Sequence, residues 1–216
     1  GVSRLLPSIR ACGIIGGSGR MSGGRYSGIA PGCDLVMVKV LDRKGNGYSS
    51  DVLAGISWIL ERKEKLAIRI LNISVGACSK RGMSENSALV KGVNRAWDAG
   101  LVVVVAAGNN GPRTMSITTP GISRKVITVG CSDDDREVLV GGNRMVDYSG
   151  RGPTAACICK PDLVAPGCSV VSCSSRADKY TIKSGTSMST PIVSGAVALL
   201  LERFPDISTE HRNTGG

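Results

Sequence analysis

At 216 residues with 42% hydrophobic side chains, the chain is long enough to bury the core of one domain. Aromatic residues make up only 3%, so the core must be built from Val, Ile, Leu and Ala, which suits a parallel sheet covered by helices. The formal net charge of +10 would suit a nucleic-acid partner, but the basic residues are scattered and no set of stacking aromatics accompanies them. We therefore expect a solvated basic surface and no nucleic-acid partner.

Apolar runs alternate along the chain with amphipathic segments. In chain order they are an apolar run at residues 35–41, a helix at about 51–65, a strand at 68–74, a helix at 85–99 closed by Gly100, and strands at 101–107 and 126–131. This alternation predicts βαβ units with right-handed crossovers. We expect an α/β fold whose ligands bind beyond the carboxyl ends of the strands.

A small-residue turn at residues 185–191 runs directly into the apolar stretch 192–201. A serine in the first turn of such a helix lies beside unpaired backbone N–H groups and the positive end of the helix dipole, which stabilise negative charge. Ser and Thr at this place also serve as plain helix caps. The segment Gly185-Thr186-Ser187-Met188 resembles the serine motif of the subtilisin-like serine proteases (subtilases, peptidase family S8). The resemblance implies that the Ser187 hydroxyl attacks the peptide carbonyl.

A second segment, residues 101–111, reads as a buried parallel strand that ends in the amide turn Gly108-Asn109-Asn110-Gly111. The same four residues would also make an ordinary surface turn. The segment resembles the oxyanion-hole segment of the family. The resemblance implies that the Asn109 side chain and the backbone N–H of Ser187 donate hydrogen bonds to the tetrahedral intermediate.

The resemblance extends over residues 13–206 and implies a three-layer α/β fold, a mostly parallel sheet flanked by helices. It also implies a serine endopeptidase that works through an acyl-enzyme and holds an extended polypeptide substrate between two protein edges. Gly45, Asn46 and Gly47 match one edge, and Ser74, Val75 and Gly76 match the other. Ala77 and Thr118 would line the primary specificity pocket.

A serine nucleophile needs a base, and the chain has one histidine, His211. A helix from Ser187 to about Arg203 would carry the chain about 24 Å from the nucleophile, so we expect His211 to be a residue of a polar tail at 207–216. In the family, the base would stand where this chain has Pro7, and the aspartate would precede residue 1. We expect either a fragment whose residues 1–12 are foreign or misread, without the catalytic Asp and His, or a non-catalytic homologue that binds peptides.

Eight cysteines are spread along the chain without a C-x-x-C pair, so no zinc site is expected. Free buried thiols act as small apolar side chains and favour a reducing compartment. Members of the family often bind structural calcium, but we expect the acidic residues 133–135 to form a solvated turn. We expect no cofactor for catalysis, no metal site, no membrane-spanning segment and a monomer.

Overall fold

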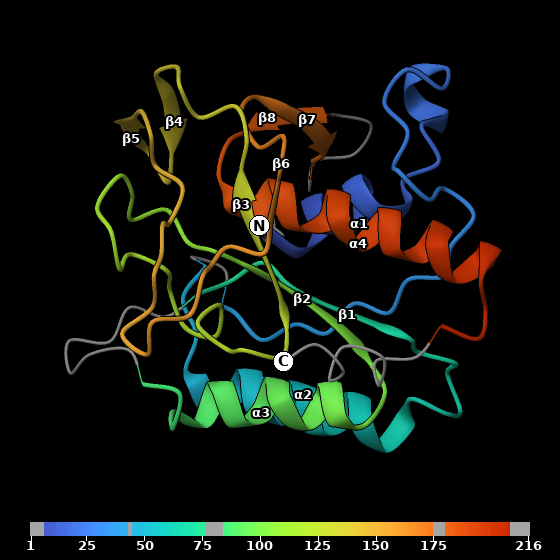
Figure 1. Ribbon diagram of the computed structural model, residues 1–216. Coiled ribbons are helices and arrows are strands. Elements are labelled where there is room, and N and C mark those ends of the chain that lie inside the picture. The colour runs from blue at the N-terminus through green and yellow to red at the C-terminus, as the bar shows by residue number, and fades with distance from the viewer. Residues whose placement is uncertain (1–6, 43–44, 77–83, 175–179, 208–216) are drawn as a thin grey trace.

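A computed structural model of the chain describes residues 7–42, 45–76, 84–174 and 180–207 (Figure 1). Its central sheet has four parallel strands in the order β1-β2-β3-β6. These strands are β1 (Ile70–Ile73), β2 (Val102–Ala106), β3 (Ile127–Cys131) and β6 (Leu163–Ala165). The predicted parallel sheet is confirmed, and three of its strands lie within the predicted runs. β6 is only three residues long and was not predicted.

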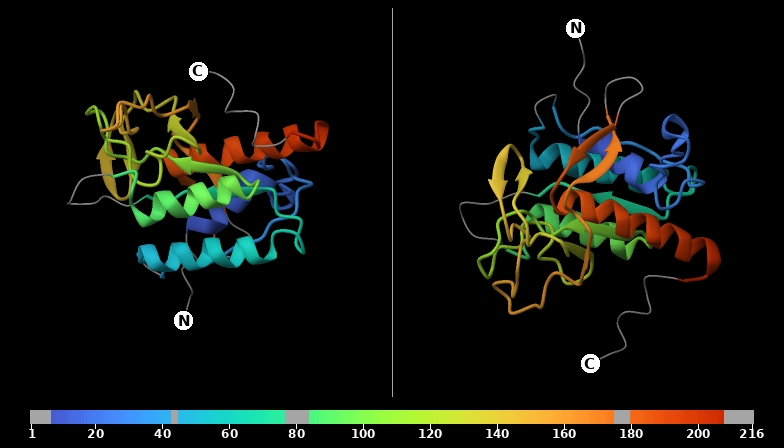
Figure 2. Two further views of the ribbon diagram at one scale, coloured as in Figure 1. Left: turned by 60° about the horizontal axis from the view of Figure 1, so that its bottom comes forward. Right: turned by 90° about the horizontal axis from the view of Figure 1, so that it is seen from above.

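Helices cover both faces of the sheet. On one face lie α2 (Ser49–Arg62) and α3 (Ala88–Asp98), and on the other lie α1 (Pro7–Gly16) and α4 (Thr186–Arg203) (Figures 1 and 2). The helix α4 packs over β2 and β3, and α1 packs against α4. The predicted three-layer α/β fold is confirmed.

The sheet is buried because its strands are almost wholly aliphatic. Val103, Val104, Val105 and Val129 have no exposed surface. Buried on both faces, parallel strands carry continuous Val and Ile runs instead of alternating patterns. This core explains how the chain folds with so few aromatic residues.

The boundaries of α3 follow from its capping residues. Ser87 is the N-cap, and its side-chain oxygen accepts a hydrogen bond from the Val90 N–H at 3.3 Å. The helix therefore begins at Ala88, three residues later than predicted. Gly100 follows with φ of +90°, a left-handed conformation that suits glycine and ends the helix.

The apolar run at residues 35–41 is not a strand in the structure. Leu35, Val36 and Met37 are 42%, 47% and 48% exposed. A cavity of about 540 Å³ lies between this run and β1, with walls completed by α2 and α4. β1 is the end strand of the described sheet. An apolar run becomes a strand only when a neighbouring strand takes up its backbone hydrogen bonds, and here the cavity separates the run from β1.

The helix α1 crosses residue 12, where the sequence suggested a domain boundary. Ala11 and Ile14 are both buried. The Ser172 side chain donates a hydrogen bond to the Arg10 carbonyl at 2.8 Å, which ties the helix to β7 (Val170–Cys173). Residues 9–12 therefore pack as part of the same body as residues 13–16. The origin of residues 1–12 stays a prediction.

Two hairpins and a short helical turn complete the described chain. β4 (Val138–Val140) pairs with β5 (Asn143–Met145), and β7 pairs with β8 (Tyr180–Lys183), both antiparallel. A 3₁₀ turn covers Arg20–Ser22. Within the described ranges, no helix is long and apolar enough to cross a membrane.

Candidate active site

Ser187 is the second residue of α4, where the backbone N–H groups of the helix start are not paired within the helix. The residue before the helix, Gly185, has φ of +137° and ψ of 158°, a conformation that is nearly exclusive to glycine. Thr186 is buried, whereas Ser187 is partly exposed. The tight turn at Gly185 thus presents the Ser187 side chain at the surface beside the positive end of the helix.

The side chain of Asn109 is held by the first residue of that helix. Its Oδ1 accepts hydrogen bonds from the Thr186 N–H at 2.9 Å and from the Thr186 hydroxyl at 3.1 Å. The same hydroxyl accepts a hydrogen bond from the Gly108 N–H at 3.2 Å. Because the amide oxygen is engaged by donors of α4, the amide nitrogen faces away from them. Thr186 therefore sets the direction in which Asn109 donates, a role that the sequence analysis did not assign.

The structure brings Ser187 and Asn109 together at Gly185. The point where a Cβ of Gly185 would stand lies 3.2 Å from Asn109 Nδ2 and 3.3 Å from Ser187 Oγ. One residue comes from the loop after β2 and the other from the start of α4, so the carboxyl end of a strand meets the amino end of a helix. A hydroxyl and an amide donor thus converge on one small space. Their roles in catalysis stay predictions.

The first predicted substrate edge is a tight turn. The Asp42 N–H donates to the Asn46 carbonyl at 2.7 Å, and the Asn46 N–H donates to the Asp42 carboxylate at 2.9 Å. Gly45 has φ of +88° within this turn. The Gly47 backbone lies so close to the Val40 carbonyl that a Cβ would stand 2.6 Å from its oxygen. These glycines permit the turn, and their contact with substrate stays a prediction.

The second predicted edge follows β1 and contacts Thr118. A Cβ on Gly76 or on Gly108 would collide with the Thr118 side chain, so this threonine is enclosed by both backbones. Thr118 is buried and donates through its N–H to the Ala107 carbonyl at 2.8 Å. Ser74 and Val75 are half-buried just before Gly76. The structure thus places the end of the second edge next to the loop that carries Asn109. Ala77 lies outside the described residues.

A general base is missing from this site as the structure describes it. Residue 7 is Pro7, the first residue of α1, and the described ranges contain no histidine. His211 lies outside them. The helix α4 does continue to Arg203, as the distance argument against His211 requires.

The turn at Gly185 is supported by the loop that follows β6. The Gly185 N–H donates to the Gly167 carbonyl at 3.0 Å, and the Gly167 N–H donates to Asp133 Oδ1 at 2.7 Å. Burial acts to raise the pKa of Asp133, but hydrogen bonds from Gly167, Cys131 and Cys168 outweigh it and hold the pKa below its usual value. An ionised carboxylate therefore anchors the loop beneath the serine turn.

The expectation of a solvated acidic turn at residues 133–135 is wrong. Asp134 is 8% exposed, and its carboxylate accepts a hydrogen bond from the Ser149 N–H at 2.7 Å. Asp133 is half-buried on the Gly167 loop, and only Asp135 is exposed, 3.8 Å from Arg136. The three carboxylates bind three separate partners because successive side chains leave the backbone in different directions. The backbone N–H donors that bury the first two come from distant segments.

This chain is similar to known proteins over most of its length. The model of the subtilase family of peptidases (S8) matches residues 9–213. Serine protease AprX of Bacillus subtilis is 39% identical over 215 residues, which cover 92% of this chain and 49% of that protein. Subtilisin DY of Bacillus licheniformis is 34% identical over 183 residues, covering 84% of this chain and 58% of that protein. The chain thus spans about half the length of the curated relatives it matches.

Solved structures show the same relationship. Sphericase superposes with a TM-score of 0.75 at 32% identity, covering 93% of this chain and 64% of that one. A cold-adapted subtilisin-like serine proteinase superposes with a TM-score of 0.71 at 30% identity, covering 93% and 62%. The family match over nearly the whole chain and the shared architecture lead to one conclusion: this chain belongs to the subtilase family of serine proteases.

Proposed function

We propose that this chain carries the nucleophile and the oxyanion-binding half of a serine endopeptidase site. Ser187 Oγ attacks the peptide carbonyl, and the oxyanion that forms accepts hydrogen bonds from Asn109 Nδ2 and the Ser187 N–H. The observation that supports this most strongly is the convergence of Ser187 Oγ and Asn109 Nδ2 beside Gly185. Since Thr186 already holds the amide oxygen of Asn109, the donor needs no reorientation when charge develops.

We further propose that the substrate is an extended polypeptide. It would lie between residues 45–47 and 74–76 as an added strand, with main-chain hydrogen bonds giving affinity. At Gly45 nothing lies within 4 Å of the place where a Cβ would stand, so a second backbone can approach this edge closely. Thr118, enclosed at the end of the second edge, would then limit the depth of the primary specificity pocket.

The base and the carboxylate that orients it would come from residues other than those described. The cavity between residues 35–41 and β1 supports this proposal, because its walls are an apolar run and the edge of a parallel sheet. One additional strand placed there would hydrogen-bond to β1 and carry an aspartate towards the carboxyl edge of the sheet, where Asn109 lies. With such a strand and a histidine in place, the acyl-enzyme mechanism would be complete.

A non-catalytic peptide-binding function is the second candidate. It is favoured by Pro7, which opens α1 where the family resemblance expects the base. In that case the glycine edges would bind peptide without cleaving it.

The test compares this chain with a version extended by its own upstream coding sequence. We expect the 216-residue chain to hydrolyse fluorogenic peptides far below the rate of complete subtilases. The extended protein should hydrolyse them briskly, react with a fluorophosphonate probe, and lose both properties in the Ser187→Ala variant. An extended protein that contains an aspartate and a histidine motif yet does neither would favour the binding function. Brisk hydrolysis by the 216-residue chain itself would contradict the proposal.

A further inference from the structure

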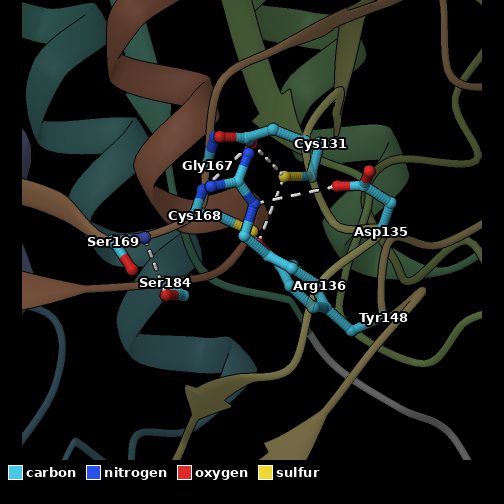
Figure 3. A network of polar contacts seen from close by, with 9 residues as sticks. Cys131, Asp135, Arg136, Tyr148, Gly167, Cys168, Ser169 and Ser184 are labelled. Carbon is cyan, nitrogen blue, oxygen red and sulfur yellow. Dashed lines mark hydrogen bonds and ion pairs between the residues drawn. The ribbon is translucent and has the colours of Figure 1, made fainter.

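Two cysteines from separate segments meet where β3 contacts the loop that supports the serine turn. Cys131 ends β3, and Cys168 follows Gly167 in the loop after β6 (Figure 3). The Tyr148 hydroxyl lies 3.2 Å from each sulfur and bridges them. Asp133 Oδ1 lies 3.1 Å from Cys131 Sγ, within hydrogen-bond distance of the thiol. Two thiols, a carboxylate and a phenol thus form one compact cluster.

The spacing of these groups matches the coordination shell of a thiophilic divalent cation. Cys131 Sγ, Cys168 Sγ and a carboxylate oxygen of Asp133 all lie within 4.8 Å of one another. In a tetrahedral zinc site, metal–sulfur bonds of about 2.3 Å place two sulfurs about 3.8 Å apart. Small rotations of the two cysteine side chains would therefore bring both sulfurs onto one ion. The Tyr148 oxygen or a water molecule would supply a fourth ligand.

The surroundings of Asp133 already resemble those of a metal-binding carboxylate. Its Oδ1 accepts hydrogen bonds from the Gly167 N–H at 2.7 Å and from the Cys168 N–H at 3.1 Å. Donors of this kind fix the direction of a ligand before the metal arrives. Cys131 is buried, but Asp133 and Cys168 are only half-buried. An ion can therefore reach the cluster from the side of these two residues.

We propose that Cys131, Asp133 and Cys168 form a binding site for a thiophilic divalent cation of the Zn²⁺ class. Binding replaces the two thiol protons, which leave to solvent, so two thiolates and one carboxylate hold the ion. Soft thiolate ligands favour Zn²⁺ and Cd²⁺ over Ca²⁺ and Mg²⁺. The site is separate from the proposed peptidase chemistry and needs no catalytic activity to be detected.

The site is coupled by contact to the serine turn. A Cβ on Gly167 would stand 2.8 Å from Cys131 Sγ, so the loop backbone rests on that sulfur. The Gly167 carbonyl in turn accepts the Gly185 N–H. An ion that joins β3 to the Gly167 loop would therefore stiffen the support of Gly185. Binding to the folded state alone would also raise the melting temperature.

The test is a Cd²⁺ titration of the reduced chain, read by the ultraviolet charge-transfer absorption of cadmium thiolates and by the number of protons released. We expect one tight site per chain. Because both thiols are protonated in the free protein near neutral pH, the affinity should rise about 100-fold per pH unit. Asp133→Asn keeps an oxygen acceptor for the Gly167 and Cys168 N–H groups but loses the charge, and should weaken binding at least about tenfold.

The chain offers a matched control. Cys157 and Cys159 are both exposed, lie two residues apart and could bind a thiophilic ion by themselves. The double variant Cys157→Ser/Cys159→Ser should keep the tight site, whereas Cys131→Ser/Cys168→Ser should lose it. Serine retains the hydrogen-bonding capacity of each position, and circular dichroism checks that both variants are folded. Tight binding that survives in Cys131→Ser/Cys168→Ser, or disappears in Cys157→Ser/Cys159→Ser, would overturn the proposal. So would the absence of a tight site in the wild type.

Discussion

The variant Gly185→Ala tests the conformation of the serine turn and the space beside Ser187 in one experiment. The native backbone at this residue, with φ of +137° and ψ of 158°, is strained for any residue with a Cβ, at a cost of about 1–3 kcal/mol. For a domain of this size, each kcal/mol lowers the melting temperature by about 2–4 °C. The variant should therefore melt several degrees below the wild type.

The same methyl group would also occupy the space between the two proposed catalytic groups, because it would stand 3.2 Å from Asn109 Nδ2 and 3.3 Å from Ser187 Oγ. We expect Gly185→Ala to abolish fluorophosphonate labelling of the extended protein, even at temperatures where the variant is fully folded. Differential scanning calorimetry and probe labelling measure the two effects separately.

Gly32→Ala is the matched control, since its φ is not in the left-handed region and a Cβ there would meet nothing within 4 Å. It should leave the melting temperature and the labelling unchanged. If Gly185→Ala melts and labels like the control, the backbone of the serine turn differs from the one described, and the reasoning about the convergence fails.

Three further predictions concern other interactions. Thr186→Val removes the hydroxyl that hydrogen-bonds to both Asn109 and Gly108. The free energy of unfolding, measured in urea, should therefore fall by about 1–3 kcal/mol, and Thr186→Ser should recover most of that stability. Asp162→Asn removes the carboxylate whose Oδ2 lies 2.6 Å from Nζ of the buried Lys160. The free energy of unfolding should fall by about 3 kcal/mol. A fall of less than about 1 kcal/mol would mean that the pair behaves as an exposed one. In the metal-free protein, burial raises the pKa of the Cys131 thiol from 9.0 to about 12. The neutral thiol therefore contributes stability that is fully present below about pH 9 and is lost as the pH rises towards 12. The free energy of unfolding should fall more steeply over that range in the wild type than in Cys131→Ala, and parallel pH profiles would contradict the assignment.

Much of the fold was predictable because strands that are buried on both faces of a parallel sheet consist of continuous Val and Ile runs. The Val runs that became β2 and β3 need no tertiary information to be identified. The run at 35–41 is equally apolar but forms no strand. Its state depends on a hydrogen-bonded neighbour, which the residues of the run do not encode.

The meeting of Ser187 and Asn109 was also predictable, because the carboxyl ends of parallel strands and the amino ends of the following helices share one edge of the sheet. The orientation of the Asn109 amide was not, since it depends on a hydroxyl 77 residues away. The thiol pair was missed for a similar reason. Cys131 and Cys168 have no recognisable spacing and meet only because β3 and β6 are neighbours in the sheet.

The most direct test is a crystal structure of the extended protein inhibited with a peptide phosphonate or boronate, because such a group can bond to the serine oxygen without turnover. We expect a covalent bond to Ser187 Oγ. An oxygen of the inhibitor should lie about 2.7–3.1 Å from both Asn109 Nδ2 and the Ser187 nitrogen. An adduct whose oxygens point away from Asn109, or one attached to a different residue, would contradict it.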